Sequence, residues 1–390
     1  MSNSNIIKLS ELSEIWYILY MSLSIGIVGL PNVGKSTLFN ALTKKGVPCE
    51  NYPFCTIDPS VGVVAVPDDR IWKLSEFSKS AKTIPAAIEF VDIAGLVKGA
   101  SEGEGLGNKF LANIREVDAI LEMVRIFPLK SDSGNEILHV MGDIDPLRDI
   151  EIINLELILA DLETVVKRKN NITKEVRKGD KEFILEDEAL AKLIPVLEAG
   201  KLANTIDFNE KELEKVKQLS LLSMKPFIYG LNKRAGSENL DTANPEIFKE
   251  LTDYIEGMGS RYVVIDAKVE DELKDFEGEE KEMFRKELGG EDDGINSLIT
   301  EGYKLLGLDT YFTTGEDETR AWTIKKGSTA PVAGMAIHTD FKDKFIRAEV
   351  VFWKDLLEAG SYGEARAKGK VRTEGKGYLV KNGDVIEFKI

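Results

Sequence analysis

Gly29-Leu30-Pro31-Asn32-Val33-Gly34-Lys35-Ser36-Thr37 is the stretch that decides the fold of this 390-residue chain. It fits the pattern G-x-x-x-x-G-K-[S/T] of a Walker A phosphate loop, and it lies between the apolar run 23–28 and the helix-like run 38–42. In this order of strand, loop and helix, backbone N–H groups and a helix N-terminus surround a phosphate. We expect Lys35 to reach the terminal phosphates and the Ser36 hydroxyl to bind Mg²⁺.

The composition is that of a soluble globular protein with two or three domains, since 43% of the residues are hydrophobic and 30% are charged. No apolar run approaches the ~20 residues of a membrane-spanning helix, and the run 15–20 lacks the flanks of a signal peptide. Two cysteines, Cys49 and Cys55, cannot form a disulfide framework. We therefore expect a cytoplasmic protein without a membrane partner.

Two segments after the phosphate loop carry the residues that complete a nucleotide-hydrolysing site. The proline-punctuated loop 51–59 contains Thr56, a candidate second hydroxyl ligand of Mg²⁺, although a lone loop threonine is more often solvated. The apolar strand 87–91 leads into Asp92, which is placed as a Walker B acid that holds Mg²⁺ through water. Gly95 then lets the backbone face the terminal phosphate.

The loop 96–107 contains four glycines, and we expect it to be a mobile second switch. Its first residue, Leu96, stands where Ras-like proteins carry the glutamine that orients the attacking water. A leucine cannot hydrogen-bond to water. Either another residue, a partner or a monovalent cation supplies this function, or hydrolysis is slow.

From about Pro146 the pattern predicts an antiparallel helical hairpin, with a turn near Gly179. Apolar residues at alternating three- and four-residue spacing predict its buried seam: Leu155, Ile158, Leu162, Val165, Ile172 and Val176, followed by Phe183, Leu190, Leu193 and Leu197. Basic residues on such a hairpin are usually a solvated face, and an RNA or protein contact is the alternative: Lys167, Arg168, Lys169, Lys174, Arg177 and Lys178.

The base end of a nucleotide site is predicted where the strand 226–231 runs into Asn232-Lys233-Arg234-Ala235. Nucleotide domains of this kind place Asn-Lys-x-Asp here, and the aspartate accepts hydrogen bonds from guanine. Ala235 has no acceptor. A further strand, 262–266, leads into Ala267-Lys268, which matches the loop whose backbone contacts the base.

From about Gly307 the alternation predicts a small α+β module with strands over 320–326 and 345–352. Residues 378–380 and 385–388 have the pattern of a hairpin around Asn382-Gly383. His338 is expected to pack or cap rather than catalyse. Basic residues interleaved with glycines suggest a nucleic-acid-facing surface near the end of the module: Lys368, Lys370, Arg372 and Lys376. The net charge of −16 argues against nonspecific nucleic-acid binding by the whole molecule, so we expect no DNA partner.

The chain resembles the YchF-type branch of the Obg-related P-loop NTPases from about Met21 to Ile390. Besides the phosphate loop, the motifs that carry the resemblance are Pro53-Phe54-Cys55-Thr56-Ile57, residues 90–100 (FVDIAGLVKGA), 302–306 (GYKLL), 320–324 (RAWTI) and 337–341 (IHTDF).

The resemblance implies an α/β P-loop NTPase of the translation-factor class, with an inserted α-helical coiled-coil arm and a C-terminal α+β TGS domain. After an N-terminal extension, residues 1–20, it implies a nucleotide-binding domain over 21–145 and 222–306, the arm over 146–221 and the TGS domain over 307–390. It also implies Mg²⁺-dependent hydrolysis of ATP in preference to GTP, and binding to the ribosome or its large subunit.

By similarity, the triphosphate binds to Asn32, Val33, Gly34, Lys35, Ser36 and Thr37. Ser36 and Thr56 ligate Mg²⁺, and Asn232 with Lys233 borders the base. Asn32 also matches an asparagine that coordinates K⁺ in related NTPases, so we expect K⁺ to stimulate the reaction.

Two positions depart from the family pattern. The base motif of the family is Asn-x-x-Glu, whereas this chain has Ala235 as the fourth residue, so base specificity is expected to be relaxed. A histidine that is proposed to be catalytic in the family aligns with Glu122. A carboxylate near the phosphates would need protonation or distance to be harmless.

Three readings follow from these observations. The first is a ribosome-associated ATPase in which Lys35, Asp92 and Gly95 form the catalytic group. The second is a GTPase, or an NTPase of dual specificity. The third is a nucleotide-gated module that binds RNA or the ribosome with negligible hydrolysis.

Overall fold

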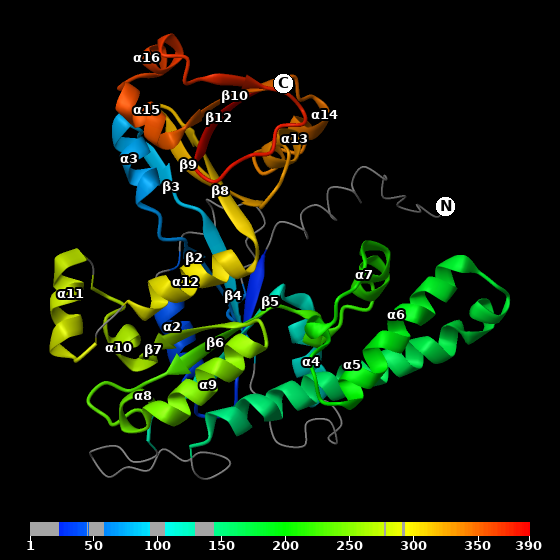
Figure 1. Cartoon of the computed structure of the whole chain (residues 1–390). Helices are drawn as coiled ribbons and strands as arrows, with labels where there is room; N and C mark the ends of the chain where they lie inside the picture. Colours follow the sequence, from blue (N-terminus) through cyan, green and yellow to red (C-terminus); the bar gives the residue numbers. More distant parts are fainter. Residues whose placement is uncertain are drawn as a thin grey trace, which may run out of the picture. The chain divides into compact units, whose positions relative to one another are not determined.

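The computed structural model describes residues 23–44, 46, 58–93, 106–128, 144–276, 278–290 and 293–390 (Figure 1). The chain divides into two compact units, one made of 24–44 and 90–301 and the other of 1–23, 45–89 and 302–390. The predicted N-terminal extension, 1–20, lies outside the described residues. The described part of the chain contains no candidate for a membrane-spanning helix.

A six-stranded sheet of order β2-β4-β1-β5-β6-β7 carries the phosphate loop. Strand β5 pairs in parallel with β1 and β6, and β6 pairs in parallel with β7. All seven residues of β5 are buried, which is typical of a parallel strand covered on both faces. The strands are β1 (Ser24–Val28), β2 (Val61–Ala65), β4 (Ala87–Asp92), β5 (Ala119–Arg125), β6 (Phe227–Asn232) and β7 (Arg261–Ile265).

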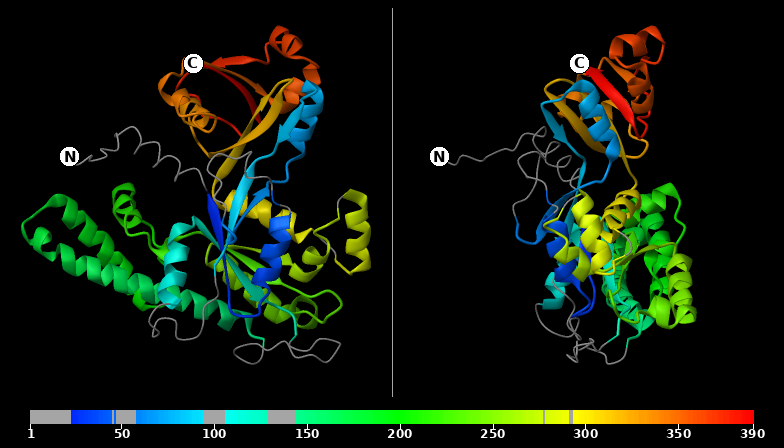
Figure 2. Two further views of the ribbon diagram at one scale, coloured as in Figure 1. Left: turned by 180° about the vertical axis from the view of Figure 1, so that it is seen from behind. Right: turned by 90° about the vertical axis from the view of Figure 1, so that its left-hand side faces the viewer.

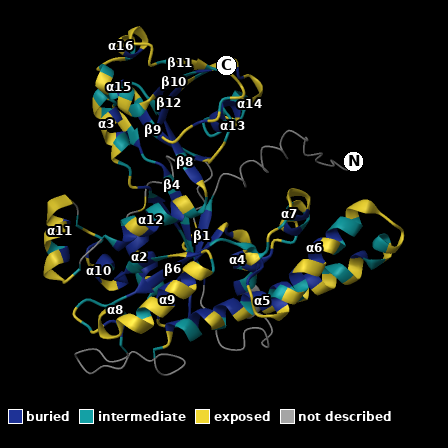
Figure 3. Ribbon diagram, in the orientation of Figure 1, coloured by how far each residue is buried: buried dark blue, intermediate teal, exposed yellow. Residues whose placement is uncertain are grey.

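Helices connect these strands and turn exposed faces outward (Figure 3). Helix α9 begins at a side-chain cap: the Asn244 side chain accepts the N–H of Ile247, and Pro245 fills the first helical position. Helix α2 packs against α10. The helices are α2 (Lys35–Lys44), α4 (Leu106–Glu116), α8 (Leu240–Ala243), α9 (Pro245–Gly257), α10 (Ala267–Glu272), α11 (Gly278–Glu287) and α12 (Gly294–Leu305).

The predicted helical hairpin is confirmed: α5 (Pro146–Arg177) and α6 (Lys181–Glu198) lie side by side (Figure 2). Ion pairs of 2.6 Å join Arg168 to Glu186 and Lys169 to Asp187 across the hairpin. Two of the six basic residues of the predicted solvated face therefore bind acids of α6. The hairpin is followed by η2 (Ala203–Thr205), α7 (Glu210–Lys217) and η3 (Leu222–Met224).

The predicted seam of the hairpin is only partly right. Ile158, Val165 and Ile172 are buried, as expected. Leu155 is 51% exposed, and Leu162 is half-buried. The apolar residues of α5 are too numerous for one seam, because they occupy more than one face of the helix.

The other unit contains a second six-stranded sheet, of order β11-β10-β12-β8-β9-β3. Strand β3 (Lys82–Ile84) pairs in parallel with β9, and helix α3 (Asp69–Ser78) packs against β9. Residues 45–89 are therefore grouped with the C-terminal residues, whereas the expected boundaries keep 21–145 in the nucleotide-binding domain. The other strands are β8 (Leu308–Thr314), β9 (Glu318–Lys325), β10 (Arg347–Phe352), β11 (Arg372–Glu374) and β12 (Asp384–Lys389).

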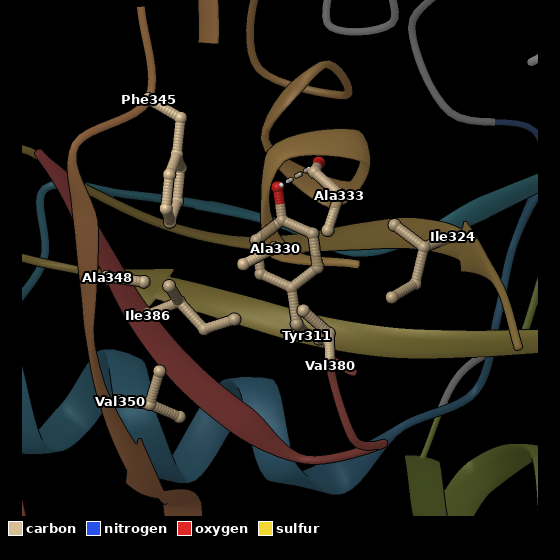
Figure 4. Close-up of a cluster of buried hydrophobic side chains, with 9 residues drawn as sticks. All are labelled: Tyr311, Ile324, Ala330, Ala333, Phe345, Ala348, Val350, Val380 and Ile386. Atoms are coloured by element: carbon tan, nitrogen blue, oxygen red, sulfur yellow. Dashed lines mark hydrogen bonds between the residues drawn. The ribbon is translucent and has the colours of Figure 1, made fainter. Parts of the chain in front are cut away.

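The core of this sheet is a cluster of buried apolar side chains around Tyr311, whose hydroxyl donates to the carbonyl of Ala333, 3.0 Å away (Figure 4). The expected strands over 320–326 and 345–352 match β9 and β10. Short helices close the unit: α13 (Ala330–Gly334), α14 (Asp340–Asp343), α15 (Trp353–Ala359) and α16 (Tyr362–Ala367).

The hairpin around Asn382-Gly383 is a wrong prediction. Strand β12 pairs with β10 and β8, and Leu379 forms only an isolated bridge to Thr329. Gly383 instead occupies a turn at φ 95°, where an added Cβ would lie 2.8 Å from the Trp353 ring.

Two further expectations concern single side chains of this unit. His338 caps the α14 turn, because its Nδ1 accepts the N–H of Asp340 at 3.2 Å. Two members of the basic group near the C-terminus face acids: Lys370 lies 3.0 Å from Asp355, and Arg372 lies 3.7 Å from Asp384. These contacts weaken the case for a nucleic-acid-facing surface there.

Candidate nucleotide-binding site

The loop between β1 and α2 has a backbone that only particular residues can adopt. Gly29 and Gly34 have φ values of 147° and 102°. An added Cβ would lie 2.6 Å from the carbonyl oxygen of Met123 at Gly29, and 2.3 Å from Nδ2 of Asn232 at Gly34. Asn32 has a φ of 64°, a left-handed conformation that asparagine tolerates better than most residues.

Asn232, the last residue of β6, ties this loop to the neighbouring segments. Its Nδ2 donates to the carbonyl oxygen of Val33 at 2.8 Å, and its Oδ1 accepts the N–H of Ala267 at 3.0 Å. The side chain is only 4% exposed. The phosphate loop, the end of β6 and the start of α10 are thus held together by one buried amide.

Lys35 opens α2, and its Nζ donates to the carbonyl oxygen of Leu30 at 2.9 Å. Burial lowers the pKa of the Lys35 ammonium, and the nearby charge of Asp92 opposes this shift. Burial raises the pKa of Asp92, and Lys35 opposes that shift in turn. Each of these two predicted catalytic residues therefore favours the charged form of the other.

A cavity of about 430 Å³ lies at the carboxyl ends of the strands, within the size range of about 300–1,000 Å³ for ligand pockets. Of the predicted site residues, Val33 is buried behind the loop and Asp92 is not among the lining residues. The described residues that line the cavity are Asn32, Gly34, Lys35, Ser36, Thr37, Phe127, Asn232, Lys233, Arg234, Ala267 and Lys268.

Phe127 is a lining residue that no sequence motif marks, and Arg234 lies within the predicted base segment without an expected role of its own. Phe127 follows the end of β5, and Arg234 follows the end of β6, so both stand at the edge where parallel strands place their ligands. Lys35, Lys233, Arg234 and Lys268 give the cavity four cations, and no carboxylate is among its described lining residues. In a chain of net charge −16, this concentration of positive charge fits a polyphosphate.

The far end of the cavity is shaped by Asp266, whose carboxylate binds backbone rather than ligand. Its Oδ2 accepts the N–H of Ala235 at 2.5 Å, and its Oδ1 accepts the N–H groups of Lys268 and Val269 at 3.1 and 3.0 Å. The Lys233 N–H donates to the carbonyl oxygen of Ile265. Asp266 therefore fixes the loop that carries Ala235, which has no side-chain acceptor of its own.

Glu122 lies within β5 and is 1% exposed. Burial, reinforced by the negative charge of Asp149, raises the pKa of its carboxyl well above the ordinary value. Glu122 is not among the residues that line the cavity. The Glu122 carboxyl is thus buried within the sheet and is not part of the cavity lining.

Some predicted residues lie outside the described part of the chain. They are Thr56, Gly95, Leu96, the two cysteines Cys49 and Cys55, and most of the glycine-rich loop 96–107.

Relatives of the chain match it over almost its whole length. A protein of Bacillus subtilis (strain 168) with the name ribosome-binding ATPase YchF is 52% identical over 369 residues, which are 95% of this chain and 99% of the relative. The chain belongs to the YchF family. A second YchF, from Haemophilus influenzae, is 47% identical over 373 residues, with 95% and 99% of the two chains covered.

Family models and a solved structure agree with this membership. A model described as 50S ribosome-binding GTPase matches residues 24–156, and the model for the C-terminal part of YchF GTPases, described as a protein of unknown function, matches 308–390. The structure of the Schizosaccharomyces pombe YchF GTPase is 38% identical, with a TM-score of 0.81 and coverage of 95% of this chain and 98% of that one. The P-loop α/β fold of the YchF family is therefore shown for this chain.

Proposed function

We propose that the chain is a cytoplasmic, ribosome-binding ATPase that hydrolyses ATP to ADP and phosphate. The observation that carries the proposal is the phosphate loop held by Asn232 at one end of a cavity lined by four cations. The names of the relatives, which include ribosome-binding ATPase and GTPase, support hydrolysis and ribosome binding.

The residues of the loop would bind the triphosphate through their backbone. The N–H groups from Asn32 to Thr37 stand at the N-terminus of α2, where the helix dipole favours an anion. Lys35 would exchange its hydrogen bond to the Leu30 carbonyl for the terminal phosphates, where it neutralises charge that develops during phosphoryl transfer. Burial of its ammonium strengthens this interaction, because the surroundings screen charge less than water does.

The donor set fits a divalent ion that is bound together with the nucleotide. The Ser36 hydroxyl lines the cavity, the Asp92 carboxylate interacts electrostatically with Lys35, and such hard oxygen donors suit Mg²⁺. Among the described residues, no group of three or more His, Cys, Asp or Glu side chains could hold a metal ion without the phosphates. When bound, the ion would neutralise charge on the phosphate oxygens. Ser36 and Thr56 would be its side-chain ligands, and Asp92 would orient its water.

The attacking water needs a group that positions it. Leu96 cannot hydrogen-bond to water, and Glu122 does not line the cavity. We propose that K⁺ contributes, held beside the phosphates by the side-chain oxygen of Asn32, whose left-handed backbone places it at the rim of the cavity.

GTP is the second candidate substrate, favoured by one observation. Lys233, Arg234 and Lys268 supply only side-chain donors around the base end, and guanine presents two acceptors, O6 and N7, on one edge. Adenine presents one acceptor and one donor on that edge, so its selection would depend on backbone carbonyls.

RNA of the ribosome is the proposed nucleic-acid partner.

Calorimetric titration of the nucleotide-free protein with ATPγS and GTPγS, in Mg²⁺ and with K⁺ or Na⁺, tests substrate choice. We expect tighter binding of ATPγS. Equal or tighter binding of GTPγS would indicate that GTP is the substrate. Failure of both nucleotides to bind would contradict the assignment of the nucleotide site.

A further inference from the structure

Helix α5 carries a second row of apolar side chains besides the buried one. Ile152, Leu155, Leu159, Leu162 and Val166 follow one another at intervals of three, four, three and four residues, which is the a and d spacing of a heptad repeat. Leu155, Leu159 and Val166 are 51%, 47% and 40% exposed, and the other two are half-buried. We call these five residues the α5 outer seam.

The outer seam is not the face that α5 uses within the fold. Asp161 accepts the N–H groups of Leu222 and Ser223 in η3, and Arg168 binds Glu186 of α6 through two hydrogen bonds. At about 100° per residue, Leu159 lies roughly 160° around the helix from Asp161 and roughly 180° from Arg168. The seam therefore points away from η3 and α6, and exposed positions recur along α5 (Figure 3).

Between the two ends of the seam, the charges beside it have one sign. Glu151 flanks it on one side, and Glu156 and Glu163 flank it on the other, at roughly 60–80° from its centre line. Residues 150–166 include no lysine or arginine. An exposed row of large apolar side chains bordered by charge is typical of a protein interaction site, and the charge specifies the partner.

We propose that the α5 outer seam binds an amphipathic helix of a partner protein that carries lysine or arginine beside its own apolar row. The seam spans fourteen residue steps, or about 21 Å at 1.5 Å per residue, which accommodates two heptads of such a helix. A basic flank would meet Glu156 and Glu163 as the residues beside a coiled-coil seam do.

The same charges argue against other occupants. A second copy of the chain, antiparallel and centred on Leu159, would bring Glu156 against Glu163 of its mate, and like charges there destabilise pairing. The phosphates of RNA would be repelled by all three glutamates. The inference is independent of the proposed nucleotide chemistry.

The test uses the full chain and two labelled 21-residue helical peptides with leucine at a and d. One has lysine at e and g, and the other has glutamate there. Fluorescence anisotropy should show binding of the lysine peptide and at least tenfold weaker binding of the glutamate peptide. The double variant Leu155→Gln/Leu159→Gln should weaken binding of the lysine peptide at least tenfold. Ile247→Gln, which changes an exposed apolar residue of α9, should leave it unchanged.

A charge exchange separates the seam from general attraction to an acidic protein. Glu156→Lys/Glu163→Lys should reverse the preference toward the glutamate peptide. ATP turnover should be unchanged in Leu155→Gln/Leu159→Gln, so loss of peptide binding is distinguishable from loss of the nucleotide site. The proposal is overturned if neither peptide binds, or if Leu155→Gln/Leu159→Gln binds the lysine peptide as well as the wild type does. It is also overturned if sedimentation shows a dimer that this double variant abolishes.

Discussion

The side-chain amide of Asn232 donates a hydrogen bond to the carbonyl oxygen of Val33, 199 residues earlier in the chain and 2.8 Å away in the structure. The end of β6 thereby supports the phosphate loop from behind, and the other end of the same amide holds the first turn of α10. This arrangement makes the shape of the triphosphate site depend on a residue expected only to border the base.

Asn232→Ala should weaken nucleotide binding at least tenfold, because it leaves the buried Val33 carbonyl and Ala267 N–H without a partner, at about 1–3 kcal/mol each. Calorimetric titration with ATPγS measures this loss. Asn209→Ala, which removes the capping box of α7, should cost about 1 kcal/mol of stability and leave the affinity unchanged. Equal affinity losses in the two variants would contradict the supporting role of Asn232.

Gly34→Ala should abolish nucleotide binding, because the added Cβ would lie 2.3 Å from Nδ2 of Asn232 on a backbone with a φ of 102°. The matched control is Gly179→Ala, where φ is 83° and nothing lies within 4 Å of the added Cβ. Gly179→Ala should lower the free energy of unfolding by only the backbone strain of about 1–2 kcal/mol, as measured by thermal unfolding. It should bind ATPγS normally. Normal ATPγS binding by Gly34→Ala would show that the loop can rearrange.

Ala235→Asp should raise the affinity for GTP relative to ATP, because a carboxylate there can accept the N1–H and 2-amino groups of guanine. Competition between the two nucleotides for the free protein gives the ratio directly. If the ratio matched that of the wild type, residue 235 would have no part in base selection.

Glu122 makes the stability of the protein depend on pH. Its pKa is raised in the folded state, so above the ordinary value of 4.5 the folded protein binds more protons than the unfolded chain, and stability falls as pH rises toward the folded pKa. In Glu122→Gln, residue 122 cannot bind or release a proton, so this pH dependence is absent. The stability of the variant relative to the wild type should therefore increase with pH, by up to about 1.4 kcal/mol per pH unit. Urea unfolding from pH 4.5 to 8 would show a constant difference if Glu122 were not responsible.

The sequence predicted the P-loop fold well because the phosphate loop, the strand and the helix around it are contiguous. Asn32, Gly34, Lys35, Ser36 and Thr37 line one cavity for that reason. Long-range features were not predictable in the same way. The bond from Asn232 to Val33 depends on the order of strands in the sheet, and no local pattern near Phe127 marks it as a lining residue.

Local patterns also misled in two places. The Asn382-Gly383 dipeptide is a strong hairpin signal, but β12 finds better partners in β10 and β8, far away in the sequence. On α5, the spacing predicts one seam although the apolar residues occupy two faces, because spacing alone does not say which face a helix buries.

The proposed ATPase activity is tested by the initial rates of ATP and GTP hydrolysis, with and without ribosomes, for the wild type and Lys35→Ala. We expect a kcat/KM for ATP at least tenfold above that for GTP, stimulation by ribosomes, and a loss of at least 100-fold in Lys35→Ala. A preference for GTP, or ATP turnover that persists without the Lys35 ammonium, would contradict the proposed activity.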